Sequence, residues 1–349
     1  MRLPTDRLTL ETEVEETDTR YGFTWVAMDD KYRIRTPDKQ FKEVPKVVVD
    51  TLRAKASEMS IEDLIAETAE QDSGAANVLR EMRDEGFVRE DAPVERVRPP
   101  EDIRLWHRAL AVALLFCIGG VLWTNALSTL AQPMLDRPYQ YLFGALPLAI
   151  PTVVCSVVVH EFGHYYTAWK QGLDPEFGAS VINGVIPAVV TRTHGGWCLP
   201  RNRRMWNTLA GPAYGLVWTL GVFALYHTVF PHPGLALAGV LCFNLQMFAI
   251  VPLFHGDGYL LMTDFLDEQN IRTRGIEHLR NGRPTWQAAY AALSYGLVIV
   301  EFAVSLVLGY VFGDVGGAGI AAALTAAIYV DSWLNVTGRL RATLSVSGE

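Results

Sequence analysis

The sequence predicts a polytopic α-helical membrane protein that carries a small soluble α+β domain at its N-terminus. Charge is unevenly divided along the 349 residues. Positions 1–104 hold 17 Lys and Arg against 25 Asp and Glu, whereas positions 105–349 hold 13 of each kind. Apolar runs long enough to cross a hydrocarbon core of about 30 Å, at about 1.5 Å per residue, occur in the second part. A charged head is therefore expected to precede a membrane body.

Residues 21–90 are predicted to form the soluble α+β domain, which has the pattern of a winged helix. Asp29-Asp30 separates two β-prone runs and is typical of a hairpin turn. The runs lie at 21–28 and 31–36, and three helical patterns follow at 43–56, 60–71 and 74–85. Ser60-Ile61-Glu62-Asp63 has the pattern of a capping box, and Gly86 suits the end of a helix.

The segments on either side of this domain set its expected location and partners. Positions 1–20 form a polar tail without the apolar core of a signal peptide, so the head is expected in the cytoplasm. Positions 91–104, with three prolines, form a linker into the membrane. The acidic balance argues against nucleic-acid binding, which favours a basic face. The acidic surface either attracts a basic or polar peptide or is simply solvated.

Six apolar runs are predicted to cross the membrane as helices and to make up a membrane domain at 105–336. The runs lie at 105–131, 141–167, 207–230, 234–256, 286–312 and 317–336. The loops after the first, third and fifth runs contain one basic residue, Arg137, whereas those after the second and fourth contain nine. The positive-inside rule then predicts a multi-pass protein of the cytoplasmic membrane with both termini, including the tail 337–349, in the cytoplasm.

The second run ends in His160-Glu161-Phe162-Gly163-His164, after a stretch at 141–159 that carries no charge. Residues four apart lie on one face of a helix, so the two histidines can hold one Zn²⁺ together. Glu161 is then placed to take a proton from a water that the metal polarises. HExxH specifies only three residues and also occurs by chance. A glutamate inside a bilayer-length helix is nevertheless costly unless it is used, so the pattern predicts an intramembrane metalloprotease.

A third zinc ligand follows from the topology. The second and fourth runs cross the membrane in the same direction and reach His160 and Asp257 after stretches of similar length. His160, His164 and Asp257 are therefore expected at similar depth, near the cytoplasmic side. Two histidines and one carboxylate, with water as the fourth ligand, form an open zinc site. Two alternatives stay open: Asp257 only ends a helix in the turn 254–258, or His255 in that turn is the ligand.

These residues resemble the site-2 protease family of intramembrane zinc peptidases, and in particular the bacterial peptide zinc metalloprotease branch found with ribosomal peptide maturation systems. The resemblance covers about 145–275 and implies that Asp257 is the third zinc ligand. Small residues at the start of the third run allow close helix packing in this family. Beyond the HExxH, the shared features are Pro187, Trp197, Arg201-Asn202-Arg203-Arg204, Leu209-Ala210-Gly211-Pro212 and Asp257-Gly258-Tyr259-Leu260-Leu261-Met262-Thr263-Asp264.

The chain also departs from the family pattern. The branch usually has Asn directly before the proline that corresponds to Pro252, and Val251 stands there instead. Asn244 lies 13 residues before Asp257, nearly on the opposite helix face at 100° per residue, so it is not expected to substitute. Arg192 replaces an acidic residue of the intervening loop. These departures concern the binding of substrate more than the binding of metal.

Two further features have open alternatives. Glu301, in the middle of the fifth run, is either a polar contact or proton relay near the active-site cavity or a partner in a helix–helix hydrogen bond. The segment 178–193 is rich in β-branched residues and glycine, which predicts a strand or hairpin. It either pairs with an extended substrate by strand addition or is only structural.

The pattern of a hairpin followed by three helices resembles the PqqD-like winged helix, the leader-peptide recognition element of peptide maturation enzymes. The resemblance implies that a leader peptide adds as a strand at the hairpin edge. The alternative is a generic regulatory or docking winged helix.

The expected activity is that of a zinc metalloendopeptidase that cleaves a ribosomally made precursor peptide and removes its leader before export. Regulated cleavage of a membrane-anchored protein is an alternative with the same chemistry. A membrane protein that binds or exports a peptide without cleaving it, on a degenerate metal fold, is an alternative of a different class. The expected partners are thus a peptide or membrane-protein substrate and the lipid bilayer.

Overall fold

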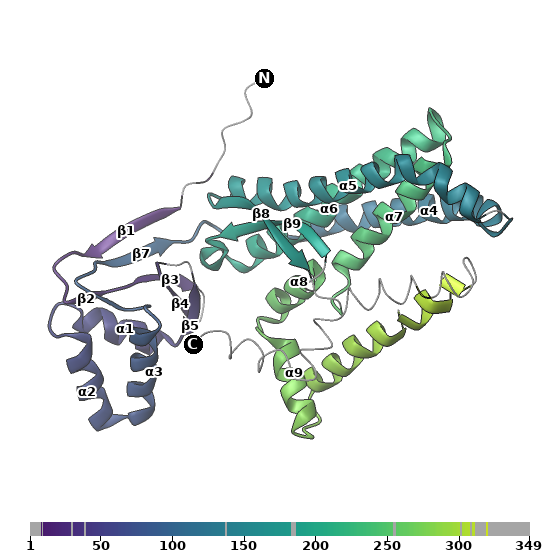
Figure 1. Cartoon of the computed structure of the whole chain (residues 1–349). Helices are drawn as coiled ribbons and strands as arrows, with labels where there is room; N and C mark the ends of the chain where they lie inside the picture. Colours follow the sequence, from purple (N-terminus) through teal and green to yellow (C-terminus); the bar gives the residue numbers. More distant parts are fainter. Residues whose placement is uncertain are drawn as a thin grey trace. The chain divides into compact units, whose positions relative to one another are not determined.

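The computed structural model describes residues 8–310, apart from short gaps at 9, 29–30, 38–39, 137, 183–185, 254–255, 301 and 308, together with residue 319. The chain divides into two compact units (Figure 1). Unit 1 joins the N-terminal 104 residues with the segments Thr167–Glu176 and Thr193–Arg204. Unit 2 contains the rest of the chain, beginning at Leu105.

Unit 1 is built on a five-stranded sheet in the order β1-β7-β3-β4-β5. The strands are β1 (Glu11–Glu16), β3 (Thr24–Met28), β4 (Lys31–Arg35), β5 (Phe41–Val44) and β7 (Val94–Arg98), and β2 (Tyr21–Gly22) pairs separately with β6 (Arg89–Glu90). The predicted hairpin is confirmed, because β3 and β4 pair antiparallel with Thr24 opposite Arg35. Strand β7 pairs parallel with β3 on the other side.

Three helices follow the sheet strands, as the sequence predicted, and cover one face of the sheet (Figure 1). They are α1 (Lys46–Lys55), α2 (Ile61–Gln71) and α3 (Ser73–Asp84). The Ser60 hydroxyl oxygen caps α2 by accepting the Asp63 backbone N–H at 3.2 Å. Gly86, at φ +78°, ends α3 in the left-handed region where a residue without a Cβ is favoured.

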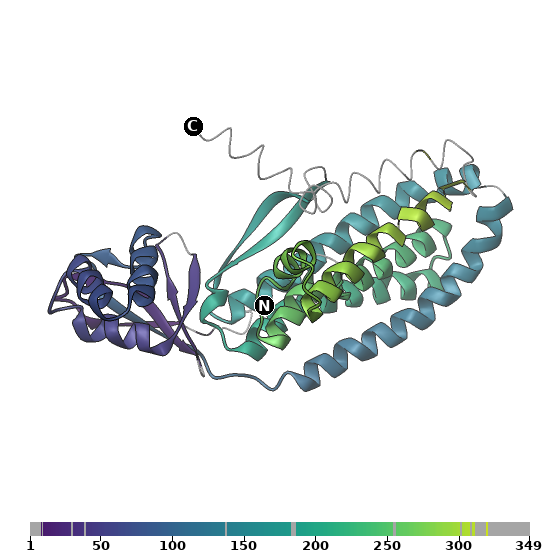
Figure 2. The ribbon, with the colours of Figure 1, turned by 90° about the horizontal axis from the view of Figure 1, so that it is seen from below.

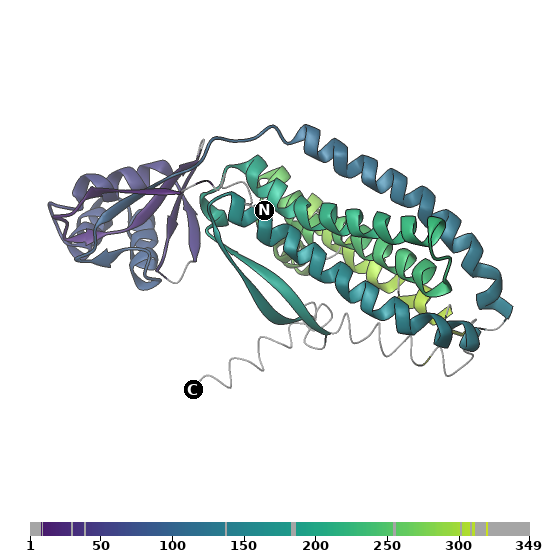
Figure 3. The ribbon, with the colours of Figure 1, turned by 90° about the horizontal axis from the view of Figure 1, so that it is seen from above.

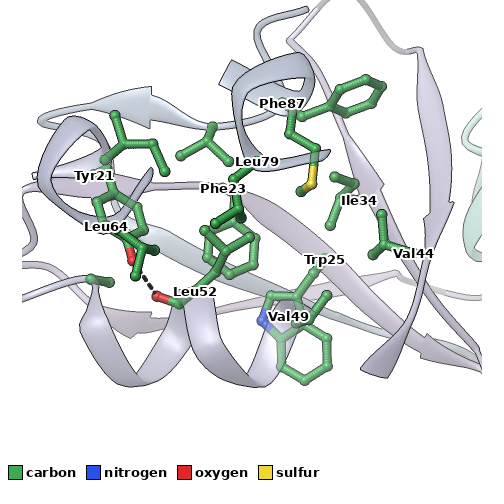
Figure 4. Packing of buried hydrophobic residues seen from close by; sticks show 14 of the residues in the cluster. Tyr21, Phe23, Trp25, Ile34, Val44, Val49, Leu52, Leu64, Leu79 and Phe87 are labelled. Atoms are coloured by element: carbon green, nitrogen blue, oxygen red, sulfur yellow. Dashed lines mark hydrogen bonds between the residues drawn. The ribbon is translucent and has the colours of Figure 1, made fainter. Parts of the chain in front are cut away.

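The core of this domain lies between the sheet and the helices (Figure 4). Tyr21, Phe23 and Ile34 from the strands are fully buried against Leu52 of α1, which is also fully buried. The Tyr21 hydroxyl donates to the Leu52 carbonyl at 2.8 Å, so the polar end of this buried ring has its hydrogen bond. Packing of this kind, rather than the charged surface, holds the α+β domain together.

The opposite face of the sheet packs on segments that come from far along the chain. Val26 of β3 and Val97 of β7 are buried with Leu173, Trp197 and other residues of the two inserted segments. The full cluster is Val26, Val97, Ala168, Leu173, Trp197, Cys198 and Leu199. The head is therefore not made of the N-terminal residues alone, since Ala168 at the end of α5, Leu173 and residues 197–199 complete its second core.

Three boundaries and one edge expected from the sequence are wrong. Strand β1 lies inside the expected tail 1–20 and β7 inside the expected linker 91–104. Both strands carry mostly charged residues, which hid their apolar positions. The stretches Thr167–Glu176 and Thr193–Arg204 belong to unit 1 rather than to a continuous membrane domain. Because β7 and β5 cover both edges of the β3–β4 hairpin, an added peptide strand cannot pair with the hairpin itself.

Among its described residues, unit 2 contains five helices that are long and apolar enough to cross a membrane. They are α4 (Trp106–Asp136), α5 (Pro138–Lys170), α6 (Arg201–Thr228), α7 (Pro233–Ile250) and a helix at Trp286–Val307. Figures 2 and 3 show α5, α6 and α7 running side by side. In the most apolar stretch of each, 61% of α6 and 56% of α7 is buried, against 17% or 18% for the other three. Apolar surface exposed on this scale indicates a membrane protein.

Shorter elements complete the described part of the chain. The predicted hairpin after α5 is confirmed as β8 (Asp174–Ile182) and β9 (Ile186–His194). Two short helices, α8 (Asp257–Leu266) and α9 (Ile271–Arg280), follow α7. The sixth expected run, 317–336, and the expected tail 337–349 lie outside the described residues.

Candidate metal centre

The structure brings Asp257 beside both histidines of the HExxH stretch. His160 Nε2 lies 3.0 Å from Asp257 Oδ2, His164 Nε2 lies 3.3 Å from Asp257 Oδ1, and the two Nε2 atoms are 3.2 Å apart. The three side chains are 12–15% exposed. The histidines come from α5 and Asp257 is the first residue of α8. Three residues that the sequence singled out thus share one site.

The outer nitrogens of both imidazoles are already occupied by hydrogen-bond acceptors. His160 Nδ1 lies 2.8 Å from the side-chain oxygen of Gln246, and His164 Nδ1 lies 2.8 Å from the backbone carbonyl of Asn207. Each Nδ1 therefore carries the proton, and in the neutral ring each Nε2 presents a lone pair to the site. The Nε2 atoms and the Asp257 carboxylate form a cluster of acceptors, which requires positive charge at its centre: a cation or protons on the rings.

The spacing of these acceptors fits a tetrahedral zinc ion. Ligand atoms about 2.0–2.1 Å from Zn²⁺ are about 3.3–3.4 Å apart in a tetrahedron. The two Nε2 atoms are 3.2 Å apart, and each faces a different oxygen of the Asp257 carboxylate, at 3.0 Å for His160 and 3.3 Å for His164. Gly211 of α6 borders the same space. A Cβ there would lie 2.2 Å from His164 Nε2 and 2.7 Å from His160 Nε2, so only glycine leaves room for both rings. The donor set and this cradle fit the metal that the sequence predicted.

The electrostatics of Asp257 are those of an anionic side chain. Burial alone would raise the pKa of this carboxyl, but His164 and His160 outweigh burial and hold the pKa below its usual range. The carboxylate is therefore ionised where it faces the two rings.

Glu161 lies at the same site but is held by the hairpin. Oxygen and nitrogen atoms of His160, Glu161 and His164 all lie within 4.8 Å of one another. The Thr191 backbone N–H of β9 donates to Glu161 Oε2 at 2.7 Å, and the Thr191 hydroxyl donates to the Glu161 carbonyl at 2.8 Å. Strand β9 thus fixes the carboxylate of the residue expected to act as the base.

Other residues named from the sequence lie elsewhere or cannot be placed. Trp197 is buried in unit 1, in the second core of the head. Arg192 packs its guanidinium across the hairpin against Gly178, where an added Cβ would be 3.1 Å from Arg192 Nε. His255 and Glu301 lie outside the described residues.

Sequence reasoning missed two groups that shape the site. Gln246 is 2% exposed in α7, and its amide N–H₂ also faces Ser156 Oγ at 3.5 Å. A glutamine in a mostly apolar run was a visible signal, because polar residues in membrane helices usually have partners. Thr191 carried no such signal, since its contact uses the backbone N–H that almost every residue has.

The chain matches no protein-family model, and neither a curated protein nor a solved structure matches it. Its function is therefore argued from the geometry of the site.

Proposed function

We propose that the chain is an intramembrane zinc metalloprotease of the site-2 type. His160, His164 and Asp257 would be the zinc ligands and Glu161 the general base. The observation that carries the proposal is the convergence of two imidazole nitrogens from α5 and the Asp257 carboxylate from α8, with 3.0–3.3 Å between facing atoms. A protein that only binds or exports a peptide on a degenerate metal fold does not need two histidines and an aspartate together beside a glutamate.

The residues of the site divide the chemistry among them. When bound, Zn²⁺ would polarise the scissile carbonyl and lower the pKa of a water towards neutrality. Glu161 would accept the proton of the attacking water and return it to the leaving amine. The Thr191 N–H orients Glu161 for both transfers. Gln246 and the Asn207 carbonyl keep each Nε2 lone pair directed at the site.

The apolar helices and the distribution of basic residues support a location in the cytoplasmic membrane with the site at the cytoplasmic side. Basic residues concentrate between the end of α5 and the first turn of α6, and in and just after α9, which follow the ends of α5 and α7. The positive-inside rule assigns these basic segments, and the head, to the cytoplasm. The positions are Lys170, Arg192, Arg201, Arg203, Arg204, Arg272, Arg274, Arg280 and Arg283.

A precursor peptide is the favoured substrate because the head offers a place for its leader. Among the described strands, β5 is one outer strand of the sheet, with Phe41 43% exposed. An extended leader would add to this edge by main-chain hydrogen bonds, as in a PqqD-like winged helix. Regulated cleavage of a membrane-anchored protein remains the second candidate with the same chemistry. A precursor-peptide gene beside this one would separate the two.

The test combines metal content with cleavage by the full chain in detergent. Wild type should bind about one zinc per chain, and His160→Ala and Asp257→Ala should each lose it. Glu161→Gln should keep zinc and lose cleavage of a library of internally quenched fluorescent peptides. A folded protein without zinc would overturn the proposal, as would retained cleavage by Glu161→Gln.

A further inference from the structure

Asp257 stands directly after a break between two helices. Helix α7 ends at Ile250 and α8 begins at Asp257, so the position of the third proposed ligand depends on the turn between them, of which residues 251–253 and 256 are described. The last carbonyls of a helix lack partners within it and need donors from elsewhere. The position of the Asp257 carboxylate is therefore only as well defined as the groups that hold this turn.

Three side chains donate to two successive carbonyls of the turn. The Tyr290 hydroxyl donates to the Pro252 carbonyl at 2.5 Å, and the Ser294 hydroxyl donates to the Leu253 carbonyl at 2.5 Å. Arg272 Nη2 donates to the same Leu253 carbonyl at 3.2 Å and to Ser294 Oγ at 2.5 Å. We call Arg272, Tyr290 and Ser294 the turn clamp.

The members of the turn clamp are themselves fixed by packing. Ser294 is fully buried, and the Arg272 guanidinium stacks over the Tyr295 ring at 5.2 Å. Helix α9, which carries Arg272, packs tightly on the helix Trp286–Val307. A Cβ on Gly275 would lie 2.2 Å from the Gln287 carbonyl oxygen. A donor on a packed element sets the position of its acceptor rather than following it.

The other end of the turn is equally confined. A Cβ on Gly258 would lie 2.2 Å from the Ile250 carbonyl oxygen, so the first turn of α8 packs directly on the end of α7. Asp257 is thus held between this close backbone contact and the two clamped carbonyls. Its carboxylate reaches both imidazoles, 3.0 and 3.3 Å away, from that one position.

We propose that the turn clamp consists of positioning residues for the metal centre, which hold Asp257 against His160 and His164 and so set the affinity for zinc. None of its members touches the proposed ligands directly. The inference rests on the proposed function, because it requires that Asp257 bind the metal. It extends the site to the helix Trp286–Val307, which carries Tyr290 and Ser294. Neither the HExxH stretch nor the Asp257 segment predicts a role for this helix.

The test measures the zinc dissociation constant of the full chain in detergent by competition with a chelator. Tyr290→Phe and Ser294→Ala each remove one donor and leave the proposed ligands unchanged. Each should weaken zinc binding, by less than the roughly 10–100-fold that is usual when a partner bonded to a ligand itself is removed. Tyr310→Phe is the matched control, because it removes the same hydroxyl from an exposed position further along the chain. Its affinity should equal that of wild type.

A second readout separates positioning from general destabilisation. With Co²⁺ in place of zinc, the visible absorption bands report ligand geometry, and they should shift in both clamp variants but not in Tyr310→Phe. Wild-type affinity and an unchanged Co²⁺ spectrum in both clamp variants would overturn the inference while leaving the proposed function intact. A wild-type chain that binds neither metal would overturn both. Zinc retained by Asp257→Ala would overturn the inference and the assignment of the third ligand.

Discussion

The Nδ1 atom of His160 lies 2.8 Å from the side-chain oxygen of Gln246, a residue 86 positions further along the chain. Gln246 reaches the ring because Gly215 of α6 leaves room for it. A Cβ on Gly215 would lie 2.4 Å from the Gln246 amide. The contact links α5 to α7 and decides which nitrogen of His160 presents its lone pair to the site. The tautomer and orientation of the His160 ring therefore depend on the packing of three helices, α5, α6 and α7.

Replacing Gln246 should weaken zinc binding without removing a ligand. In Gln246→Leu the Nδ1 proton of His160 loses its acceptor, so the ring is free to change tautomer and orientation. Zinc affinity should fall about 10–100-fold in a chelator competition assay. Asn244→Leu, two residues away on α7, is the control and should bind zinc like wild type. Equal affinities of Gln246→Leu and wild type would show that the contact does not orient the ligand.

A single added methyl group at Gly211 should abolish the metal centre. The new Cβ of Gly211→Ala would lie 2.2 Å from His164 Nε2, far inside van der Waals contact, and backbone constraint prevents easy relief. Zinc content should fall close to zero. Gly221→Ala is the matched control on the same helix, because a Cβ there would meet nothing within 4 Å. Full zinc occupancy in Gly211→Ala would contradict the claim that only glycine at this position leaves room for both imidazole rings.

The contact between β9 and Glu161 should matter for turnover rather than for metal. Thr191→Pro removes the N–H that donates to Glu161 Oε2, whereas Thr191→Val removes only the hydroxyl contact to the Glu161 carbonyl. We expect Thr191→Pro to lower kcat by at least about tenfold with zinc retained, and Thr191→Val to have a smaller effect. Val190→Pro controls for a proline in this strand. An equal fall of kcat in Thr191→Pro and Val190→Pro would mean that disruption of β9, and not loss of the Thr191 N–H, lowers the rate.

The Cys198 thiol should react slowly at neutral pH. Burial raises its pKa to about 11, above the ordinary value, so at pH 8 only about one thiol in a thousand is ionised. The folded state holds this proton more tightly than the unfolded state, so its contribution to stability is complete below the unfolded pKa and is lost as pH rises through about 11.

The measurement uses a chain in which the other three cysteines are serine, Cys117→Ser, Cys155→Ser and Cys242→Ser. Iodoacetamide labelling, followed by mass spectrometry, should be slow at pH 8 and accelerate about tenfold per pH unit up to pH 10. Labelling of the urea-unfolded chain gives the reference rate. Equal folded and unfolded rates at pH 8 would contradict the burial of Cys198.

Arg33 should contribute more to the stability of unit 1 than an exposed ion pair does. Its side chain is 5% exposed, donates to Glu43 Oε1 at 2.9 and 2.5 Å, and donates to the Trp197 carbonyl at 3.1 Å. Arg33→Met leaves both acceptors without this donor and should lower the local opening free energy by about 1–3 kcal/mol. Hydrogen exchange of peptides covering 31–36 and 193–200, in the full chain, measures the local opening free energy.

Lys42→Met provides the contrast for Arg33. Lys42 pairs with Glu81 at 2.7 Å and Glu85 at 3.1 Å, all at more exposed positions, and such pairs contribute about 1 kcal/mol or less. In the same two peptides, Lys42→Met should lower the local opening free energy by about 1 kcal/mol or less. A larger effect for Lys42→Met than for Arg33→Met would contradict the ranking by burial.

Local patterns in the sequence predicted the parts of this protein that depend on neighbouring residues. The capping of α2 by Ser60, the glycine end of α3 at Gly86 and the hairpin around Asp29-Asp30 follow from propensities and hydrogen bonds within a few positions. The spacing of His160 and His164 is equally local. Strands β1 and β7 were missed because both consist mostly of charged residues, which give little β signal until the strands pair with partners.

The sequence by itself determined that two histidines share a helix face beside a glutamate, and that several runs are long enough to cross a bilayer. Hydropathy and periodicity carry this information because they act within one element. Only the tertiary structure decided that Asp257 reaches both rings, that Gln246 and the Asn207 carbonyl orient them, and that Arg272, Tyr290 and Ser294 hold the turn before Asp257. These contacts join residues from different helices, and helix packing rather than local preference sets such distances.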